Sequence, residues 1–253
     1  MTDVAIVRAA IAPMHAEARV SSAQISQRLA GHAVTVKFTE GDWMRVFGED
    51  GYEGWMHRGY VHFVTDTPVS PDDRRLSLGC VVHDRERGWS RALPLGAWLS
   101  SSETVVTGYA LERVGRTAAL PRDASSVATT AVERFAGTPY QWGGVTPWGA
   151  DCSGIVQTAF WLHGVILPRD AWQQAEVGRA AGSDMSRWDA GDLLFFSERA
   201  DGRITHVGIA LGGGRMVHLA LGRGGYAVEQ LDLHDDTYVT LLMSRFVTAR
   251  RVI

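Results

Sequence analysis

The stretch DCSGIVQTAFWLHG, residues 151–164, contains the features from which both the fold and the chemistry of this chain can be inferred. Asp151 is a typical helix N-cap residue, so we expect a helix from about Cys152 to His163, with Gly164 just after its end. A thiol in the first turn of a helix experiences the helix dipole and free N–H groups, which favour a thiolate. Most cysteines are small buried residues, but this setting favours a nucleophile at Cys152.

Two later runs each carry one histidine in a strand-like context. They are ITHVGIA at 204–210 and RMVHLA at 215–220, and the glycines 212–214 lie between them. Antiparallel neighbours joined by such a turn can present His206 and His218 on one face of a sheet. We therefore expect His206 to be the general base for Cys152 and His218 to orient it. A histidine satisfied by a structural hydrogen bond is the plainer alternative for either residue.

Zinc is a competing use for one cysteine and two histidines, because catalytic zinc sites use three protein ligands. A zinc-bound thiolate does not need a helix start, however, and the sequence lacks close pairs such as C-x-x-C or H-x-x-x-H. We expect no metal and no other cofactor.

Asp151 and Tyr140 are candidate substrate contacts. A carboxylate beside the thiol should raise the pKa of Cys152, against the effect of the helix. Asp151 therefore either caps the helix only, or also binds a positive group of the substrate such as a free α-amine. Tyr140 could donate its hydroxyl to an oxyanion or to the substrate, or it could be a structural tyrosine.

The first part of the chain has the rhythm of a small β-barrel. Residues 33–38, 43–47 and 54–56 are short, partly alternating runs, and the turn residues 49–51 separate the last two. A second set of short runs follows the Pro- and Asp-rich linker 68–75. There, RGWSRA resembles GDWMRV of the first set, which suggests two diverged copies of one barrel. The runs of the second set are 80–83, 88–93 and 94–99.

The third part of the chain reads as helices followed by antiparallel strands. Ser125 or Ser126 could cap a helix that ends at Gly137, and the helix that starts at Cys152 follows. This order predicts an α+β fold. The expected strands are 193–196, 206–211 and 216–220, and the expected domains are 1–66, 67–122 and 123–253.

Composition describes an ordinary globular protein with no basic footprint for nucleic acid. The formal net charge is -3, and no run of Lys and Arg stands out. The first 19 residues do not read as a signal peptide, and no apolar run could span a bilayer, so we expect a cytoplasmic protein. Cys80 and Cys152 are the two cysteines, which we expect to be free, with Cys80 in a core. We expect His83 and His163 on the surface.

The ordered motifs of the third part resemble those of the NlpC/P60 cysteine peptidases. They are GTPYQWGG at 137–144, DCSG at 151–154, AGDLLFF at 190–196 and HVGIA at 206–210, followed by His218. The resemblance implies a papain-like α+β catalytic domain and, before it, two bacterial SH3-like barrels. It also implies Cys152 as nucleophile, His206 as base and His218 as orienting residue.

The layout is similar to that of γ-D-glutamyl-L-diamino acid endopeptidases of murein recycling. That likeness implies a stem peptide with a free N-terminal L-Ala as substrate, held by Asp151. From the composition and the apolar runs we expect no nucleic acid and no membrane as a partner. Tyr140, Asp151 and Ser153 match positions that line such substrate sites. In such enzymes the first SH3-like domain also closes the cleft with acidic and aromatic groups, and Tyr60 is the candidate for the aromatic one. Two departures concern specificity: GH at 31–32 where Gly-Glu is expected, and Ala171 where serine is common.

Two other functions stay open from the sequence. A secreted hydrolase acting on intact wall would need a signal sequence and a cleft open to blocked N-termini. A non-catalytic binder of wall peptides would be expected to carry a damaged triad, whereas all three residues are present here.

Overall fold

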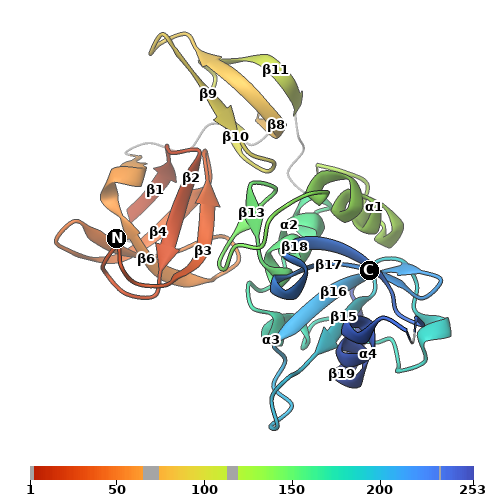
Figure 1. Cartoon of the computed structure of the whole chain (residues 1–253). Helices are drawn as coiled ribbons and strands as arrows, with labels where there is room; N and C mark the ends of the chain where they lie inside the picture. The colour runs from red at the N-terminus through yellow and green to blue at the C-terminus, as the bar shows by residue number, and fades with distance from the viewer. Residues whose placement is uncertain (1–2, 65–73, 113–118, 234) are drawn as a thin grey trace. The chain divides into compact units, whose positions relative to one another are not determined.

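The structure is a computed structural model that describes residues 3–64, 74–112, 119–233 and 235–253. It divides into two compact units (Figure 1). Unit 1 comprises residues 1–119 together with 142–146, and unit 2 comprises residues 120–141 together with 147–253. The expected domain boundary at residue 66 and most of the expected linker 68–75 lie outside the described residues.

The first barrel of unit 1 is a seven-stranded antiparallel sheet with a 3-10 turn, η1 (Arg58–Tyr60). The strand order is β3-β2-β6-β5-β4-β1-β7. Alternating residues such as Val34, Met44 and Met56 are buried in its core, as the short alternating runs predicted. The expected turn 49–51 is present between β5 and β6. The strands are β1 (Asp3–Val7), β2 (Ile11–His15), β3 (Gln24–Leu29), β4 (Ala33–Glu40), β5 (Trp43–Phe47), β6 (Glu53–His57) and β7 (Val61–Phe63).

The second barrel is built around one long strand, β8 (Arg75–Asp84), which pairs with three others. They are β9 (Trp89–Leu93), β10 (Trp98–Leu99) and β11 (Glu103–Leu111). Of the expected run 94–99, only the last two residues form a strand. Cys80 packs in the core of this barrel, as expected, and its thiol is 3.3 Å from the Ser77 hydroxyl.

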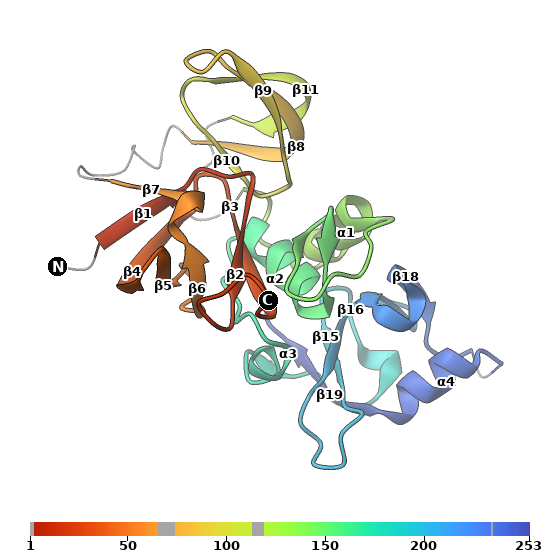
Figure 2. The ribbon, with the colours of Figure 1, turned by 60° about the vertical axis from the view of Figure 1, so that its left-hand side comes forward.

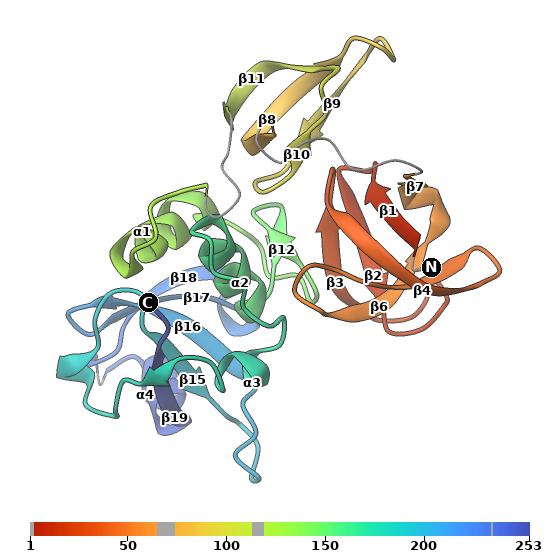
Figure 3. The ribbon, with the colours of Figure 1, turned by 180° about the vertical axis from the view of Figure 1, so that it is seen from behind.

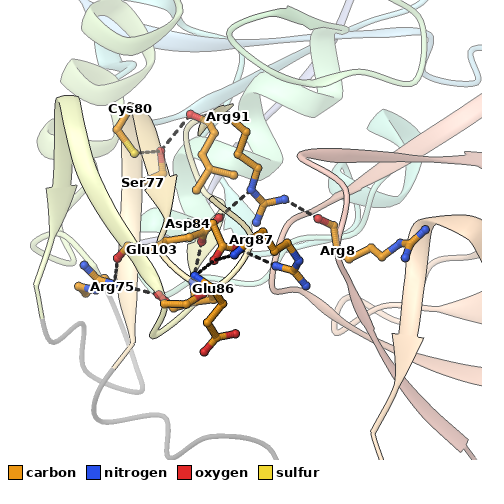
Figure 4. A network of polar contacts seen from close by, with 12 residues as sticks. Arg8, Arg75, Ser77, Cys80, Asp84, Glu86, Arg87, Arg91 and Glu103 are labelled. Carbon is orange, nitrogen blue, oxygen red and sulfur yellow. Dashed lines mark hydrogen bonds and ion pairs between the residues drawn. The ribbon is translucent and has the colours of Figure 1, made fainter. Parts of the chain in front are cut away.

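A polar network ties the strands of the second barrel to each other and to the first (Figure 4). The buried carboxylate of Glu103 accepts a hydrogen bond from Arg91 Nε at 2.7 Å. Arg91 also donates to the backbone carbonyl of Arg8, in the first barrel. The network therefore links the two barrels within unit 1.

His32 and Gly31 also lie where the two barrels of unit 1 meet. His32 Nε2 is 2.9 Å from the carbonyl of Gly96, and Gly31 (φ 76°) faces Trp98 so closely that a Cβ would come within 2.5 Å of its Cβ. Burial lowers the pKa of His32 to about 4. The residues found in place of the expected Gly-Glu pair thus join the barrels, and His32 is neutral at neutral pH.

Unit 2 begins with two helices that pack on each other and on strands β16 (His206–Gly212) and β17 (Arg215–Ala220). Asp123 caps the first, α1 (Ala124–Phe135), so the expectation that Ser125 or Ser126 is the cap is wrong. Asp123 accepts the Ser126 N–H because the chain is extended at residue 123 and already helical at residue 124. The second helix, α2 (Cys152–Leu162), has the expected bounds, and Gly164 follows it with φ 75°.

His163 is buried between these helices, and the expectation of a surface residue is wrong. Its Nε2 is 2.9 Å from the hydroxyl of Thr130 on α1, and its Nδ1 contacts the carbonyl of Pro121. The ring is buried because it supplies polar partners to two other elements at the end of α2. His83 is half-buried on β8, 3.2 Å from the Ser90 hydroxyl.

A six-stranded sheet in the order β14-β19-β15-β16-β17-β18 forms the centre of unit 2 (Figure 2). Helix α4 packs with a core cluster that includes Leu194, Met216 and Ala249. The view from behind shows helices α1 and α2 on one side of this sheet and helix α4 on the other (Figure 3). The strands of this sheet are β14 (Arg179–Ala180), β15 (Leu193–Phe196), β16 (His206–Gly212), β17 (Arg215–Ala220), β18 (Gly225–Gln230) and β19 (Phe246–Arg251). Outside it lies β13 (Gly149–Ala150), which pairs with β12. The remaining helices are α3 (Ala171–Gln174), η3 (Met185–Arg187), η4 (Leu221–Arg223) and α4 (Thr237–Ser244).

The short strand β12 (Val145–Thr146) belongs to unit 1, where its residues lie against the first barrel. The Trp142 carbonyl accepts a hydrogen bond from Gln24 at 3.0 Å, and the Val145 N–H donates to Gln27 at 3.1 Å. The segment 142–146 is therefore part of the same compact unit as the barrels. Among the helices of the described residues, none is long and apolar enough to cross a membrane.

Candidate active site

Cys152 is the first residue of α2, and Asp151 caps this helix, as the sequence predicted. The carboxylate of Asp151 accepts the N–H of Gly154 at 2.8 Å. The thiol of Cys152 is buried and takes part in hydrogen bonds with backbone groups of Val207 and Ser153. Val207 is the neighbour of His206, so the packing of α2 on β16 brings the thiol to the strand that carries this histidine.

The two candidate histidines meet on neighbouring strands. Ile209 on β16 is opposite Val217 on β17, so His206 and His218 point to the same face of the sheet. His206 Nε2 is 2.8 Å from His218 Nδ1. The glycine turn between the strands and the antiparallel pairing were both expected from the sequence.

The carboxylate of Glu229, which was not expected from the sequence, contacts the ring nitrogen of His218 that faces away from His206. Oε1 of Glu229, on β18, is 3.3 Å from His218 Nε2, and both side chains are buried. Arg223 binds the same carboxylate with two hydrogen bonds, at 2.7 and 2.9 Å. The strand-like alternation of residues 225–230 could have indicated a strand beside β17, but no pattern marked Glu229 itself.

Burial keeps Cys152 and His206 neutral in the resting protein. Burial, and then the negative charge of Asp151, raises the pKa of Cys152 to about 12. Burial, and then the neighbouring His218, lowers the pKa of His206 to about 3. The resting residue is therefore a thiol rather than the thiolate expected from the helix position, because loss of solvation outweighs the helix dipole.

Asp151 is held by a cation that the sequence analysis did not connect to it. Arg169 is 1% exposed and donates to both carboxylate oxygens, at 3.0 and 2.7 Å. The Ser153 hydroxyl donates to Asp151 at 3.2 Å and accepts from Arg169 at 2.8 Å. Binding of a substrate ammonium by Asp151 stays a prediction, and such an ammonium would compete with Arg169. A buried carboxylate needs a partner of opposite charge. This requirement at Asp151 could have pointed to a nearby arginine such as Arg169.

Tyr140 lies near Cys152, in a short bridge with Ala150. Burial raises the pKa of Tyr140, and the nearby charges of Cys152 and Asp151 raise it further, so the hydroxyl keeps its proton and can donate. Tyr60 belongs to unit 1, where it packs against the core of the first barrel. Substrate contact by either tyrosine, or by Ser153, stays a prediction.

Ala171, the second departure from the expected pattern, is the buried first residue of α3. Asp170 caps this helix together with Gln173 in a capping box. Within the described part of the chain, no group of three or more His, Cys, Asp and Glu side chains is arranged to hold a metal ion.

Comparison with known proteins agrees with the division of the chain. Residues 137–243 match the model of the NlpC/P60 family, and residues 12–62 match that of the bacterial SH3 domain. A crystal structure of an NlpC/P60 family protein from Bacillus cereus has the same fold, with a TM-score of 0.79 at 19% identity, covering 98% of this chain and 99% of that one. The expected fold class, an SH3-like region followed by an α+β catalytic domain, is thereby confirmed.

Two curated relatives extend over most of the chain. A gamma-D-glutamyl-L-lysine dipeptidyl-peptidase from Bacillus subtilis is 32% identical over 232 residues, which is 84% of this chain and 77% of that protein. A protein of the same name from Bacillus cereus is 28% identical over 250 residues, which is 85% of this chain and 72% of that protein.

Proposed function

Because this chain belongs to the NlpC/P60 family, whose peptidases are cysteine hydrolases, we propose that it cleaves peptides derived from peptidoglycan between γ-D-Glu and the following diamino acid. The observation that supports this proposal most strongly is the packing of α2 against β16 and β17. It brings the Cys152 thiol to the backbone beside His206, which in turn contacts His218 at 2.8 Å. A nucleophile, a base and an orienting group are the parts that covalent acyl transfer needs.

The reaction proceeds through an acyl-enzyme. His206 takes the thiol proton as the sulfur of Cys152 attacks the γ-carbonyl carbon of D-Glu. When the tetrahedral intermediate collapses, the carbon–nitrogen bond breaks and His206 returns the proton to the leaving amine. Water, deprotonated by His206, then attacks the thioester, which releases the dipeptide and restores the thiol. The neutral resting pair supports this order, because the proton must move to His206 as the thiol attacks.

The oxyanion is stabilised by the N–H of Cys152 and by the hydroxyl of Tyr140. The first N–H groups of a helix have no partners within that helix, so the start of α2 offers a donor beside the sulfur. The raised pKa of Tyr140 supports its role, because the hydroxyl stays protonated throughout the working pH range.

The substrate we propose carries a free N-terminal L-Ala followed by γ-D-Glu. The names of the two relatives support this, since a dipeptidyl-peptidase releases the first two residues of a peptide. The same names specify L-Lys as the diamino acid for those proteins. For this chain we propose the broader class of L-diamino acids, which includes diaminopimelate.

Three substrates test the proposal by mass spectrometry of the products: L-Ala-γ-D-Glu-L-Lys, its N-acetylated form and intact peptidoglycan. We expect release of L-Ala-D-Glu and lysine from the free peptide and little from the acetylated one. Equal turnover of both peptides, with release from intact wall, would instead support a wall hydrolase. Binding without turnover would support a non-catalytic wall-peptide binder.

A role in recycling and a cytoplasmic location are part of the same proposal. A peptidase limited to free N-termini would act on peptides already released from the wall. Fractionation of cells that produce the untagged protein, followed by immunoblotting, tests the location. Recovery in the medium or the cell envelope would argue against it.

A further inference from the structure

Glu229 is a buried carboxylate in contact with the histidine pair, and the proposed reaction makes no use of it. Ala227 on β18 is opposite His218 on β17, so Glu229, two residues on, shares a face with His218. Its Oε1 lies 3.3 Å from His218 Nε2.

Glu229 is ionised and held in one position. Burial acts to raise the pKa of Glu229, but hydrogen bonds with His218 and Arg223 outweigh it and bring the pKa to about 2. Arg223 also binds Asp236 at 2.7 Å and lies over the ring of Tyr238, 4.2 Å from its centroid. Tyr238 in turn packs edge-on against the ring of His218. The Glu229 carboxylate is therefore held in place by Arg223, on the side away from His206.

The charge on Glu229 determines which ring nitrogens carry protons. An ionised carboxylate only accepts hydrogen bonds, so His218 Nε2 must hold the proton between them. In a neutral ring, His218 Nδ1 then has a lone pair, and it accepts from His206 Nε2 at 2.8 Å. His206 Nε2 therefore carries a proton, which leaves its Nδ1 as the nitrogen free to receive the proton of the Cys152 thiol.

We propose that Glu229 is a positioning residue that sets the tautomers of His218 and His206, so that His206 Nδ1 is the base for the Cys152 thiol. Glu229 acts through His218 and touches neither substrate nor thiol. The inference deepens the proposed peptidase mechanism, and its kinetic consequences rest on that function.

The tautomers can be measured directly, without substrate, by long-range ¹H–¹⁵N correlation spectra of the ¹⁵N-histidine-labelled full chain at neutral pH. We expect both His206 and His218 to be protonated at Nε2 and unprotonated at Nδ1. In Glu229→Ala, we expect His218 to populate both tautomers, because its fixed acceptor is gone. A proton on Nδ1 of His206 in the wild-type protein would overturn the proposal, whether or not any variant folds.

Kinetics of the full chain separate positioning from a purely structural role. Glu229→Gln keeps the shape of the side chain and removes its charge. We expect kcat to fall about 10- to 100-fold, the range seen for carboxylate partners of metal-ligating histidines, while KM changes less than about twofold. Glu198→Gln is the matched control, because Glu198 is an exposed glutamate of the same unit that pairs only loosely with Arg245, and its kcat should equal that of the wild type. Equal kcat for folded Glu229→Gln and Glu198→Gln would contradict the proposal. Failure of the peptide substrate itself would bear on the peptidase function and leave the tautomer measurement valid.

Discussion

At the scale of single residues, the site is governed by burial more than by the helix dipole. Cys152 has the helix position that favours a thiolate, yet burial and Asp151 raise its pKa to about 12. His206 has a pKa lowered to about 3 by burial and by His218. Both shifts disfavour charge, so the pair rests as thiol and imidazole, and in the reaction we propose the proton moves to His206 only as the thiol attacks.

The reactivity of Cys152 toward iodoacetamide should follow from this neutral pair. Only the thiolate reacts, so below the thiol pKa the rate should rise about tenfold per pH unit from about pH 6 to pH 9. Cys80→Ser removes the second thiol and leaves Cys152 as the single target. A rate that stays constant at acidic pH would reveal a thiolate–imidazolium pair and contradict the neutral resting state.

Asp151 and Arg169 form a buried ion pair whose loss should be costly. We expect Asp151→Asn to lower the free energy of unfolding by about 3–5 kcal/mol, because Arg169 would keep its charge in a buried position. Asp201→Asn is the matched control, since Asp201 pairs with Arg199 at an exposed position where solvent screens the pair, and it should change the free energy of unfolding far less. Urea denaturation measures both, and equal effects would show that Arg169 finds another partner.

At the scale of elements, most of the catalytic unit could be predicted and its supporting residues could not. Helix α2 and strands β15 to β17 follow the sequence pattern closely, because caps, glycine turns and periodicity are local signals. Glu229 and Arg169 act through contacts between elements distant in sequence, which no local pattern encodes. His163 was missed for the same reason, since its partners Thr130 and Pro121 lie more than 30 residues away.

His163 and His83 give a matched test of this difference. His163→Ala would leave the buried Thr130 hydroxyl without its imidazole partner and would open a cavity at the end of α2, whereas the Pro121 carbonyl would keep the N–H of Asp123. We expect a loss of about 3 kcal/mol of unfolding free energy. His83→Ala, at a half-exposed position with a single hydroxyl contact, should stay within about 0.5 kcal/mol of the wild type. Chemical denaturation measures both variants. A small effect of His163→Ala would mean that water reaches the gap between α1 and α2.

At the scale of the whole molecule, the order of SH3-like barrels and catalytic domain was predictable, but the path of the chain was not. The motif GTPYQWGG at 137–144 reads as one loop of the catalytic domain. In the structure, residues 142–146 belong with the barrels, through hydrogen bonds from Gln24 and to Gln27. The chain therefore passes between the two units three times, which no local signal at these positions indicates.

Gln27→Ala tests the attachment of the segment 142–146. Gln27 is buried and accepts the Val145 N–H, so its truncation removes this hydrogen bond between β3 and the segment. We expect the full chain with this change to be cleaved faster by protease within residues 142–146, because that segment opens more often. Gln230→Ala, at a partly exposed site of unit 2, should leave the rate unchanged. Equal cleavage rates in the two variants would show that Gln27 does not hold the segment.

The central claim is that Cys152 performs the cleavage of a γ-D-glutamyl bond to a diamino acid. Its most direct test is the rate of product formation from L-Ala-γ-D-Glu-L-Lys and from the diaminopimelate peptide by wild type and Cys152→Ala, with thermal unfolding to verify that both are folded. We predict L-Ala-D-Glu and the free diamino acid from the wild type, and a loss of at least about 10⁴-fold in the variant. A folded Cys152→Ala protein that retains turnover within tenfold of the wild type would contradict the claim.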